Sequence, residues 1–279
     1  MLININGSLV DFSTPVVMGI LNITPDSFFE GSRYQKKDEI CYRVEEIVRQ
    51  GGKIVDVGGY STRPGSKEVT ENEEFDRVVF AMEVIHKNFS DIPVSIDTFR
   101  AKIALTAVRD FGAAIINDIS GGELDEKMFE TVAALKVPYI LMHMKGNPQT
   151  MQQNIHYVDF IPEIFLYFAE KVDQLKQLGV NDIMLDPGFG FAKTLEQNYE
   201  LLANMNLFSQ FGLPVLAGVS RKKMIWQLLD SSPDESLNGT SVLNTLALMQ
   251  GANILRVHDV KEAVEVVKIY NEYKKFVTI

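Results

Sequence analysis

Short apolar runs rich in Val and Ile recur along the chain, and each is followed by a loop and then by a stretch with helical periodicity. Runs that are apolar on both faces are typical of strands buried between two layers, as parallel strands are when helices cover the sheet. Strand and helix alternate eight times in this way. The predicted strands are residues 16–21, 54–57, 94–96, 113–116, 139–142, 183–185, 215–219 and 254–257.

The stretches between these runs carry apolar residues at spacings of three and four, which predicts amphipathic helices. Thr70 and Glu73 form a capping-box pattern ahead of one such stretch, so a helix is expected to begin there and run to about residue 85. Cys41 lies on the apolar stripe of residues 38–49, which predicts a core position. The other predicted helices are residues 101–110, 125–135, 161–178, 195–204, 237–250 and 260–273.

Eight alternations over about 250 residues predict a (β/α)8 TIM barrel, a closed parallel sheet with helices outside and functional loops at the carboxyl ends of its strands. A doubly wound open sheet is the alternative, because alternation by itself does not establish closure. The first fourteen residues alternate around Gly7 and Ser8, which predicts an N-terminal β-hairpin over the amino end of the barrel. One large domain or two small ones would fit the length. Since no linker or low-complexity tract divides the chain, we expect a single domain over residues 1–279.

The amino-acid composition and the net charge exclude several classes of protein. The chain has 279 residues, of which 46% are hydrophobic and 23% charged, and this balance excludes a disordered, collagenous or coiled-coil protein. The formal net charge of −10 argues against nucleic acid as a partner. No apolar run reaches the roughly 18 residues of a membrane span. A single cysteine and an N-terminus without a basic region and apolar core predict a cytoplasmic protein.

Polar residues follow the predicted strands at their carboxyl ends, the face on which barrel enzymes carry their active sites. Taken singly, an Asp, Asn or Ser in this position is explained as the cap of the next helix, and the glycine-rich stretch 58–65 as a turn. His143 alone is explained as a hydrogen-bonded core histidine. Helix caps, however, do not require Lys222 and Arg256 at the same end of the barrel, so the combination favours an active site.

The residue types suggest the ligand. Asp97, Asn117 and Asp186 offer several acceptors and one amide, which suits the N–H edge of a 2-amino-4-oxo pyrimidine ring, and Lys222 would meet an acceptor of that ring. The loops after the last two strands are the usual phosphate site of barrels. They carry Ser220, Lys222, Arg256 and His258. The predicted ligand is therefore a flat heterocycle that bears a phosphate or pyrophosphate.

Eight motifs carry a resemblance to a known family. In chain order they are MGILNITPDSF, GGYSTRPG, SIDTFR, INDISGG, LMHMKGNPQTMQ, LDPGFGF, GVSRK and RVHD. Together they resemble the dihydropteroate synthases, the folate-pathway enzymes that sulfonamides inhibit. The resemblance covers essentially the whole chain. It implies a (β/α)8 transferase that joins 6-hydroxymethyl-7,8-dihydropterin pyrophosphate to p-aminobenzoate with Mg²⁺, releases pyrophosphate, and forms a homodimer through its outer helices.

The resemblance also implies roles for individual residues. The pterin-binding set corresponds to Asp97, Asn117, Asp186 and Lys222, with Met142 lining the same pocket. The pyrophosphate anchors correspond to Arg256, His258 and Asn22, and Asn22 also approaches the magnesium. The walls of the aminobenzoate site correspond to Phe28, Thr62, Arg63, Pro64, Phe191 and Ser220. The predicted catalytic residues are thus Asn22, Arg63, Asp97, Asp186, Lys222 and Arg256.

This sequence departs from the family pattern at four positions. Many members have Glu where this chain has Tyr60, Asp where it has Glu30, Gly where it has Ala192, and a small hydroxyl residue where it has Lys223. Lys223 either adds a cation near the aminobenzoate pocket or faces solvent, and solvent is the usual surrounding of a lysine.

Three other functions compete with this reading. A barrel that transfers a methyl group from methyltetrahydrofolate to a corrinoid shares an acidic pterin pocket but needs neither STRPG nor the RVH anchor. A Schiff-base aldolase needs its lysine on a strand, whereas Lys222 follows one. A degenerate homologue could bind pterins as a sensor, and only an assay of pyrophosphate release distinguishes it.

Overall fold

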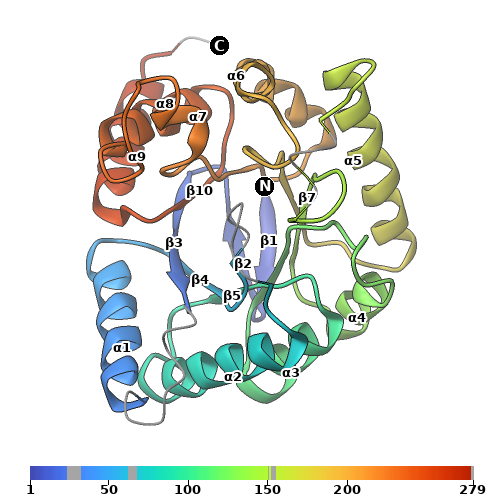
Figure 1. Ribbon diagram of the computed structural model, residues 1–279, viewed down its shortest axis with the longest axis vertical. Coiled ribbons are helices and arrows are strands. Elements are labelled where there is room, and N and C mark those ends of the chain that lie inside the picture. The colour runs from blue at the N-terminus through green and yellow to red at the C-terminus, as the bar shows by residue number, and fades with distance from the viewer. Residues whose placement is uncertain (24–32, 62–67, 150, 152–154, 278–279) are drawn as a thin grey trace.

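The computed structural model describes residues 1–23, 33–61, 68–149, 151 and 155–277. A parallel sheet of eight strands curls into a barrel, and helices surround it (Figure 1). The strands follow the order β8-β7-β6-β5-β4-β3-β10-β9, and a parallel bridge between Leu185 and Val215 joins the two ends of this series. The predicted TIM-like barrel is therefore confirmed, and the open sheet is excluded.

The observed elements follow the predicted alternation closely. The barrel strands are β3 (Val16–Asn22), β4 (Ile54–Gly58), β5 (Val94–Asp97), β6 (Ile115–Asp118), β7 (Tyr139–Met142), β8 (Ile183–Asp186), β9 (Leu216–Ala217) and β10 (Ile254–Val257). The helices are α1 (Arg33–Arg49), α2 (Glu71–Asn88), α3 (Ala101–Phe111), α4 (Met128–Leu135), α5 (Phe160–Gln177), α6 (Leu195–Ala203), α7 (Lys223–Trp226), α8 (Leu237–Met249) and α9 (Val260–Lys274), with a 3₁₀ helix over Met205–Phe211. None of the described helices combines the length and apolar character that a bilayer span requires.

Strand β9 is shorter than predicted. The apolar run 215–219 forms only two strand residues, Leu216 and Ala217. The chain turns directly afterwards, where the Lys222 N–H donates to the Val219 carbonyl at 3.2 Å and Arg221 has a left-handed φ of +54°. The sequence analysis also missed the short helix α7 and the 3₁₀ helix before β9.

Local sequence explains where the longest helices begin and what they bury. Thr70 caps α2 with the predicted box: its backbone N–H donates to Glu73 Oε2 at 2.8 Å, and its Oγ1 accepts from the Glu73 N–H at 3.3 Å. Cys41, on α1, packs against the core but is only half-buried, so it lies at the edge of the core and not inside it as predicted.

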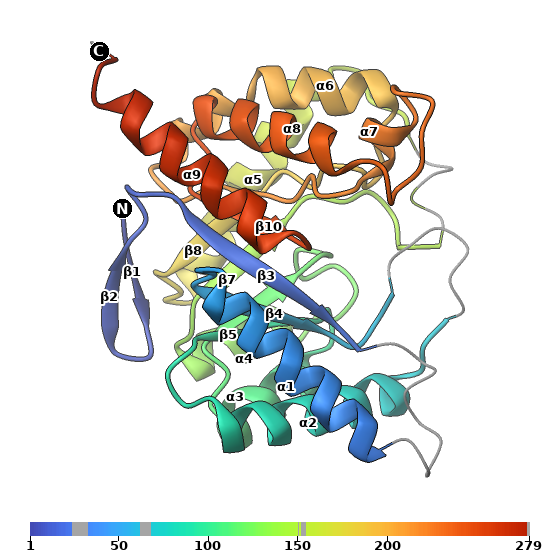
Figure 2. The ribbon, with the colours of Figure 1, turned by 90° about the vertical axis from the view of Figure 1, so that its left-hand side faces the viewer.

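The amino-terminal hairpin closes one end of the barrel. Strands β1 (Leu2–Ile5) and β2 (Ser8–Asp11) pair antiparallel and lie beside the ends at which the barrel strands begin (Figure 2). The hairpin and the segment after it contribute Ile3, Ile5 and Phe12 to a buried cluster with barrel residues Met18, Ile54, Ala114, Ile115, Ile140, Met184, Leu216 and Ile254. The predicted cover is therefore present, and apolar side chains fill this end of the barrel.

Candidate active site

The barrel interior changes from apolar to polar along its strands. Side chains two residues apart on a strand point to the same face. Four of the strands that contribute an apolar residue to the buried cluster at the amino end of the barrel carry a polar residue two positions later, which therefore also points into the interior. The pairs are Ile54 and Asp56, Ile115 and Asn117, Met184 and Asp186, and Ile254 and Arg256. Three of the residues predicted at strand ends thus share the carboxyl end of the barrel interior, together with one that was not predicted.

Arg256 lies between two carboxylates in this polar region. Its Nε donates to Asp56 Oδ2 over 2.6 Å, and its Nη2 donates to Asp97 Oδ2 over 2.6 Å. Asp56 is fully buried and also accepts from Asn117 Nδ2 at 3.2 Å. Arg256 was predicted as a pyrophosphate anchor. The structure adds that it links β10 to carboxylates on β4 and β5.

Burial and the charges of the neighbouring groups act in opposite directions on the pKa values of Arg256 and Asp97. Burial by itself lowers the pKa of Arg256, but the charges of Asp56 and Asp97 outweigh it and raise that pKa. Burial raises the pKa of Asp97 to about 7, against the lowering effect of Arg256. Arg256 is therefore a permanent cation, and its charge favours the ionised form of Asp97 against the effect of burial.

Asp186 and Lys222 meet the loop that joins β8 to α6. Asp186 Oδ1 accepts from the Gly188 N–H at 2.8 Å, and Lys222 Nζ donates to the Phe189 carbonyl. The Lys222 ammonium also lies 4.8 Å from the centre of the Phe191 ring. Burial raises the pKa of Asp186 and lowers that of Lys222 to about 8, and the charge of each residue opposes the shift of the other.

One acceptor in this region has no partner in the described part of the chain. Asn117 Oδ1 is buried and makes no hydrogen bond there. A buried polar atom is usually paired, so an unpaired acceptor among these polar side chains indicates a ligand or water donor. An apolar cluster at the same ends of β6 and β7 contains the predicted residues Met142 and Phe191. A polar edge beside apolar side chains suits a flat ring.

The ends of β9 and β10 also come together as predicted. Ser220 Oγ lies 3.1 Å from His258 Nδ1 and accepts from the His258 backbone N–H at 3.2 Å. Arg221 points elsewhere, because it forms a bidentate pair with Asp259 through two bonds of 2.8 Å. Of the three residues Ser220, Arg221 and Lys222, Arg221 is therefore the one whose side chain is held by Asp259.

The remaining predicted residues divide between the described and undescribed parts of the chain. Asn22 ends β3 and is exposed. The departure at Glu30 and the predicted site residues Phe28, Thr62, Arg63 and Pro64 lie outside the described residues.

Three departures from the family pattern have structural explanations. Tyr60 packs edge-on against Phe99 with ring centres 5.1 Å apart, and its hydroxyl accepts from Gln149 Nε2 at 2.8 Å. Ala192 has a left-handed φ of +48°, a conformation that glycine adopts with less strain. Lys223 is exposed, so its side chain faces solvent.

Sequence reasoning missed two charged residues of this region, Asp56 and Lys193. Asp56 interrupts the apolar strand IVDVG. A charged residue inside a strand that is buried on both faces is unusual, and this feature of the sequence could have identified Asp56 as a site residue. Lys193 is 3% exposed and lies against His143, which confirms that His143 is a hydrogen-bonded core histidine. Lys193 stands one residue before Thr194, the N-cap of α6, and nothing in the sequence at that position indicates that the lysine is buried.

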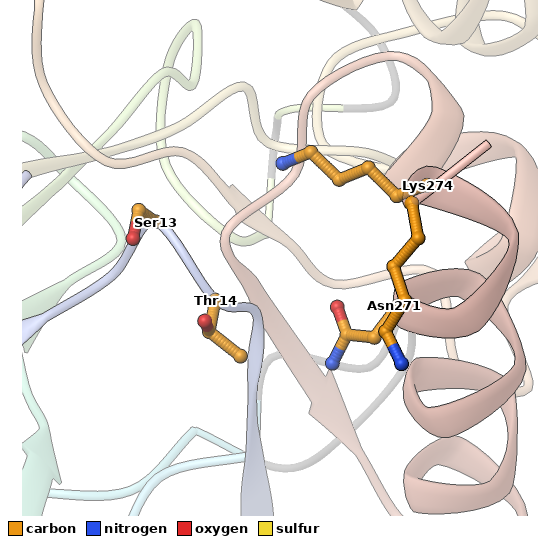
Figure 3. A pocket seen from close by; sticks show the side chains of 5 residues that line it. Ser13, Thr14, Asn271 and Lys274 are labelled. Carbon is orange, nitrogen blue, oxygen red and sulfur yellow. The ribbon is translucent and has the colours of Figure 1, made fainter. Parts of the chain in front are cut away.

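A surface pocket lies at the opposite, amino-terminal end. Figure 3 shows it between the segment before β3 and helix α9. It is lined by Ser13, Thr14, Asn271, Lys274 and Lys275. It contains none of the predicted site residues.

Comparisons with known proteins agree with this geometry. Residues 18–258 match a family model described as pterin binding enzyme. The dihydropteroate synthase of Escherichia coli K12 is 44% identical over 266 residues, which cover 94% of this chain and 93% of that protein. The Yersinia pestis dihydropteroate synthase, solved in complex with a sulfonamide drug, has a TM-score of 0.90 and 40% identity over 99% of both chains. The Xanthomonas albilineans dihydropteroate synthase, solved with 4-aminobenzoic acid, has a TM-score of 0.88 and 32% identity over 99% of both chains.

Proposed function

The chain belongs to the pterin-binding enzyme family, as a dihydropteroate synthase of folate biosynthesis, and on this basis we propose how its residues carry the reaction. The transferase joins 6-hydroxymethyl-7,8-dihydropterin pyrophosphate to p-aminobenzoate and releases pyrophosphate. The observation that carries the assignment of residues is the array of the buried Asn117 and Asp186 with the half-buried Lys222 at the carboxyl end of the barrel.

In this proposal the pterin ring enters edge first. The unpartnered Asn117 Oδ1 and the Asp186 carboxylate accept from the ring N–H groups, and Lys222 donates to a ring acceptor. Met142 and Phe191 cover the apolar faces of the ring. Asp186→Asn keeps the shape but removes the charge, so pterin binding is expected to weaken by about tenfold or more. Unchanged titration of 6-hydroxymethylpterin with this variant would refute the assignment.

We propose that the bond to pyrophosphate ionises before the arylamine attacks. The described polar residues of the site supply charges but no activated nucleophile. Asp97 and Asp186 stabilise positive charge on the pterin methylene, and Arg256 stabilises the departing anion through Nη1, which has no described hydrogen bond. Removing one such contact costs on the order of 3 kcal/mol of barrier. A large secondary deuterium isotope effect at the methylene is expected, and a value near unity would contradict ionisation.

The oxygen donors near Asn22 fit a magnesium ion. Asn22 Oδ1 and Asp97 Oδ2 both border the space beside Gly58, each 3.6 Å from the point where a Cβ would stand. Mg²⁺ is commonly held by one or two protein oxygens together with water and substrate phosphates, so it needs no acidic cluster, and the described residues contain none. When bound there, the metal neutralises charge on the pyrophosphate. Asn22→Ala is expected to raise the Mg²⁺ concentration needed for half-maximal rate.

We assign the aminobenzoate site to Phe191 and Ser220 together with Phe28, Thr62, Arg63 and Pro64. The support is the family resemblance and the 4-aminobenzoic acid and sulfonamide complexes of the two solved relatives. Sulfonamides should therefore compete with p-aminobenzoate. Arg63→Ala should raise the KM for p-aminobenzoate more than it weakens pterin binding. Equal effects on both substrates would contradict this division.

We also propose a homodimer that buries an apolar face of α8. Val242, Leu246 and Met249 are 51%, 42% and 57% exposed, and their spacings place them on one side of the helix. Sedimentation should give a dimer for the chain and a monomer for Leu246→Glu. A single domain over residues 1–279 and a cytoplasmic location stay predictions of the sequence analysis.

The decisive experiment is pyrophosphate release from pterin pyrophosphate and p-aminobenzoate, with each substrate omitted in turn. Release that needs both substrates supports the synthase. Binding without release would instead indicate a pterin sensor. Substrate binding alone cannot distinguish these two functions.

A further inference from the structure

A lysine that the proposed reaction does not use is buried behind the β8–α6 loop. Lys193 Nζ lies 3.0 Å from His143 Nδ1 and donates to the carbonyls of Gly188 and Phe191 at 2.9 and 3.0 Å. The His143 carbonyl is a fourth and longer contact at 3.5 Å. An ammonium has three N–H donors, and the three shorter contacts are enough to use them all. Burial lowers the pKa of His143 well below its usual range, which leaves the ring neutral and able to accept at Nδ1.

The same loop contacts the proposed pterin site on its other side. Between the two carbonyls that Lys193 holds, the Phe189 carbonyl accepts from Lys222 Nζ. The N–H of Gly188 donates to Asp186. Asn198 adds a further fixed point, because its Oδ1 accepts from the Gly190 N–H at 2.6 Å.

The space around this contact is closed to larger groups. Gly188 has a φ of +74°, and a Cβ there would stand 2.1 Å from the His143 carbonyl oxygen and 3.3 Å from Lys193 Nζ. The loop backbone at Gly188 therefore packs directly against His143 and Lys193, with no room for a side chain between them.

We propose that Lys193 is a positioning residue for pterin recognition, which holds the 188–191 loop so that Asp186 and Lys222 meet the ring in the correct geometry. Its charge also acts on the site, because the Lys193 cation is one of the groups that favour the ionised form of Asp186. Burial lowers the pKa of Lys193 itself to about 7; the charge of Asp186 opposes this shift, and the charges of Lys222 and Lys145 add to it. Lys193 is therefore a cation below neutral pH, the range in which Asp186 loses its charge. This inference rests on the proposed function, since it concerns the same pterin pocket.

The test is the affinity for 6-hydroxymethylpterin as a function of pH in Lys193→Met and Lys193→Gln. Both variants remove the charge, and the glutamine keeps a polar group in case the methionine variant does not fold. Affinity at about pH 6, below the lowered pKa of Lys193, should fall by about tenfold or more, the usual effect of losing hydrogen bonds to a charged group. The low-pH loss of binding should also move to higher pH, because Asp186 becomes harder to ionise.

Tyr157→Phe is the matched control. The Tyr157 hydroxyl donates to the Ala192 carbonyl at 3.0 Å, so this variant loses a neutral hydrogen bond to the same segment. Its affinity and pH profile should match the wild type. If the Lys193 variants fold and bind with wild-type affinity and pH profile, the positioning role is wrong. If the wild-type chain itself does not bind the pterin, the proposed function fails, and this inference fails with it.

Discussion

Replacing Asp56 by Asn should destabilise the fold and impair turnover at the same time. Asp56 is fully buried and accepts from both Arg256 Nε, at 2.6 Å, and Asn117 Nδ2, at 3.2 Å. An asparagine has the same shape but no charge, and its amide nitrogen would point a donor at one of these two donors. The variant therefore leaves a part-buried guanidinium, 19% exposed, with Asp97 as its one described carboxylate.

The size of the effect follows from these contacts. Breaking a buried ion pair by removing one partner costs about 3–5 kcal/mol. The lower end applies here, because the Arg256 bond to Asp97 remains, so we expect a loss of about 3 kcal/mol in the free energy of unfolding. For a chain of roughly this length, each kcal/mol lowers the melting temperature by about 2–4 °C, which gives a drop of about 6–12 °C.

Thermal unfolding and pyrophosphate release measure the two consequences. Asp91→Asn makes the same chemical change at an exposed position and should leave the melting temperature unaltered. Combining Asp56→Asn with Arg256→Gln should cost less than the sum of the two single losses, because the double variant no longer buries an unpaired charge. A melting temperature within about 1 °C of wild type for Asp56→Asn would refute the reasoning.

Two further predictions concern the other charged and apolar parts of the barrel. Lys222→Met should abolish pyrophosphate release and yet stabilise the fold. Burial lowers the pKa of Lys222 to about 8, whereas in the unfolded chain this lysine keeps its proton up to about pH 10.4. The free energy of unfolding of the wild type therefore rises between about pH 8 and pH 10, and the difference in stability between variant and wild type should shrink over that range. A difference in melting temperature that stays constant over this pH range would contradict this. Phe12→Ala should cost about 3–5 kcal/mol of stability, because Phe12 is fully buried at the amino end of the barrel. Its KM values should equal those of the wild type, since the proposed pterin site lies at the other end, and altered substrate affinity would show that the two ends are coupled.

The barrel was predictable because its pattern is local. Each strand is an apolar run and each helix has its own stripe, and among the described helices α2 and α6 also have their own capping boxes. Strand ends were predictable for the same reason. Since parallel strands all end on one side, Asp97, Asn117 and Asp186 had to lie at the same end once the sheet was parallel.

The contacts between distant residues were not predictable in this way. Asp56 was overlooked because it stands inside an apolar run, and its partner Arg256 lies 200 residues later. Lys193 resembles a surface lysine before a helix cap until the fold brings it to His143, fifty residues earlier. The length of β9 also escaped prediction, because an apolar run does not reveal where the chain turns.

The alternation of strands and helices, the hairpin and the residue types at the strand ends could be predicted from local sequence, because they depend on periodicity over a few neighbouring residues. Closure through Leu185 and Val215, the pairing of Arg256 with two carboxylates and the burial of Lys193 appear only in the folded chain. Burial, ion pairing and shifted pKa values depend on which side chains from distant strands share the same small volume inside the barrel, and no local pattern contains that information.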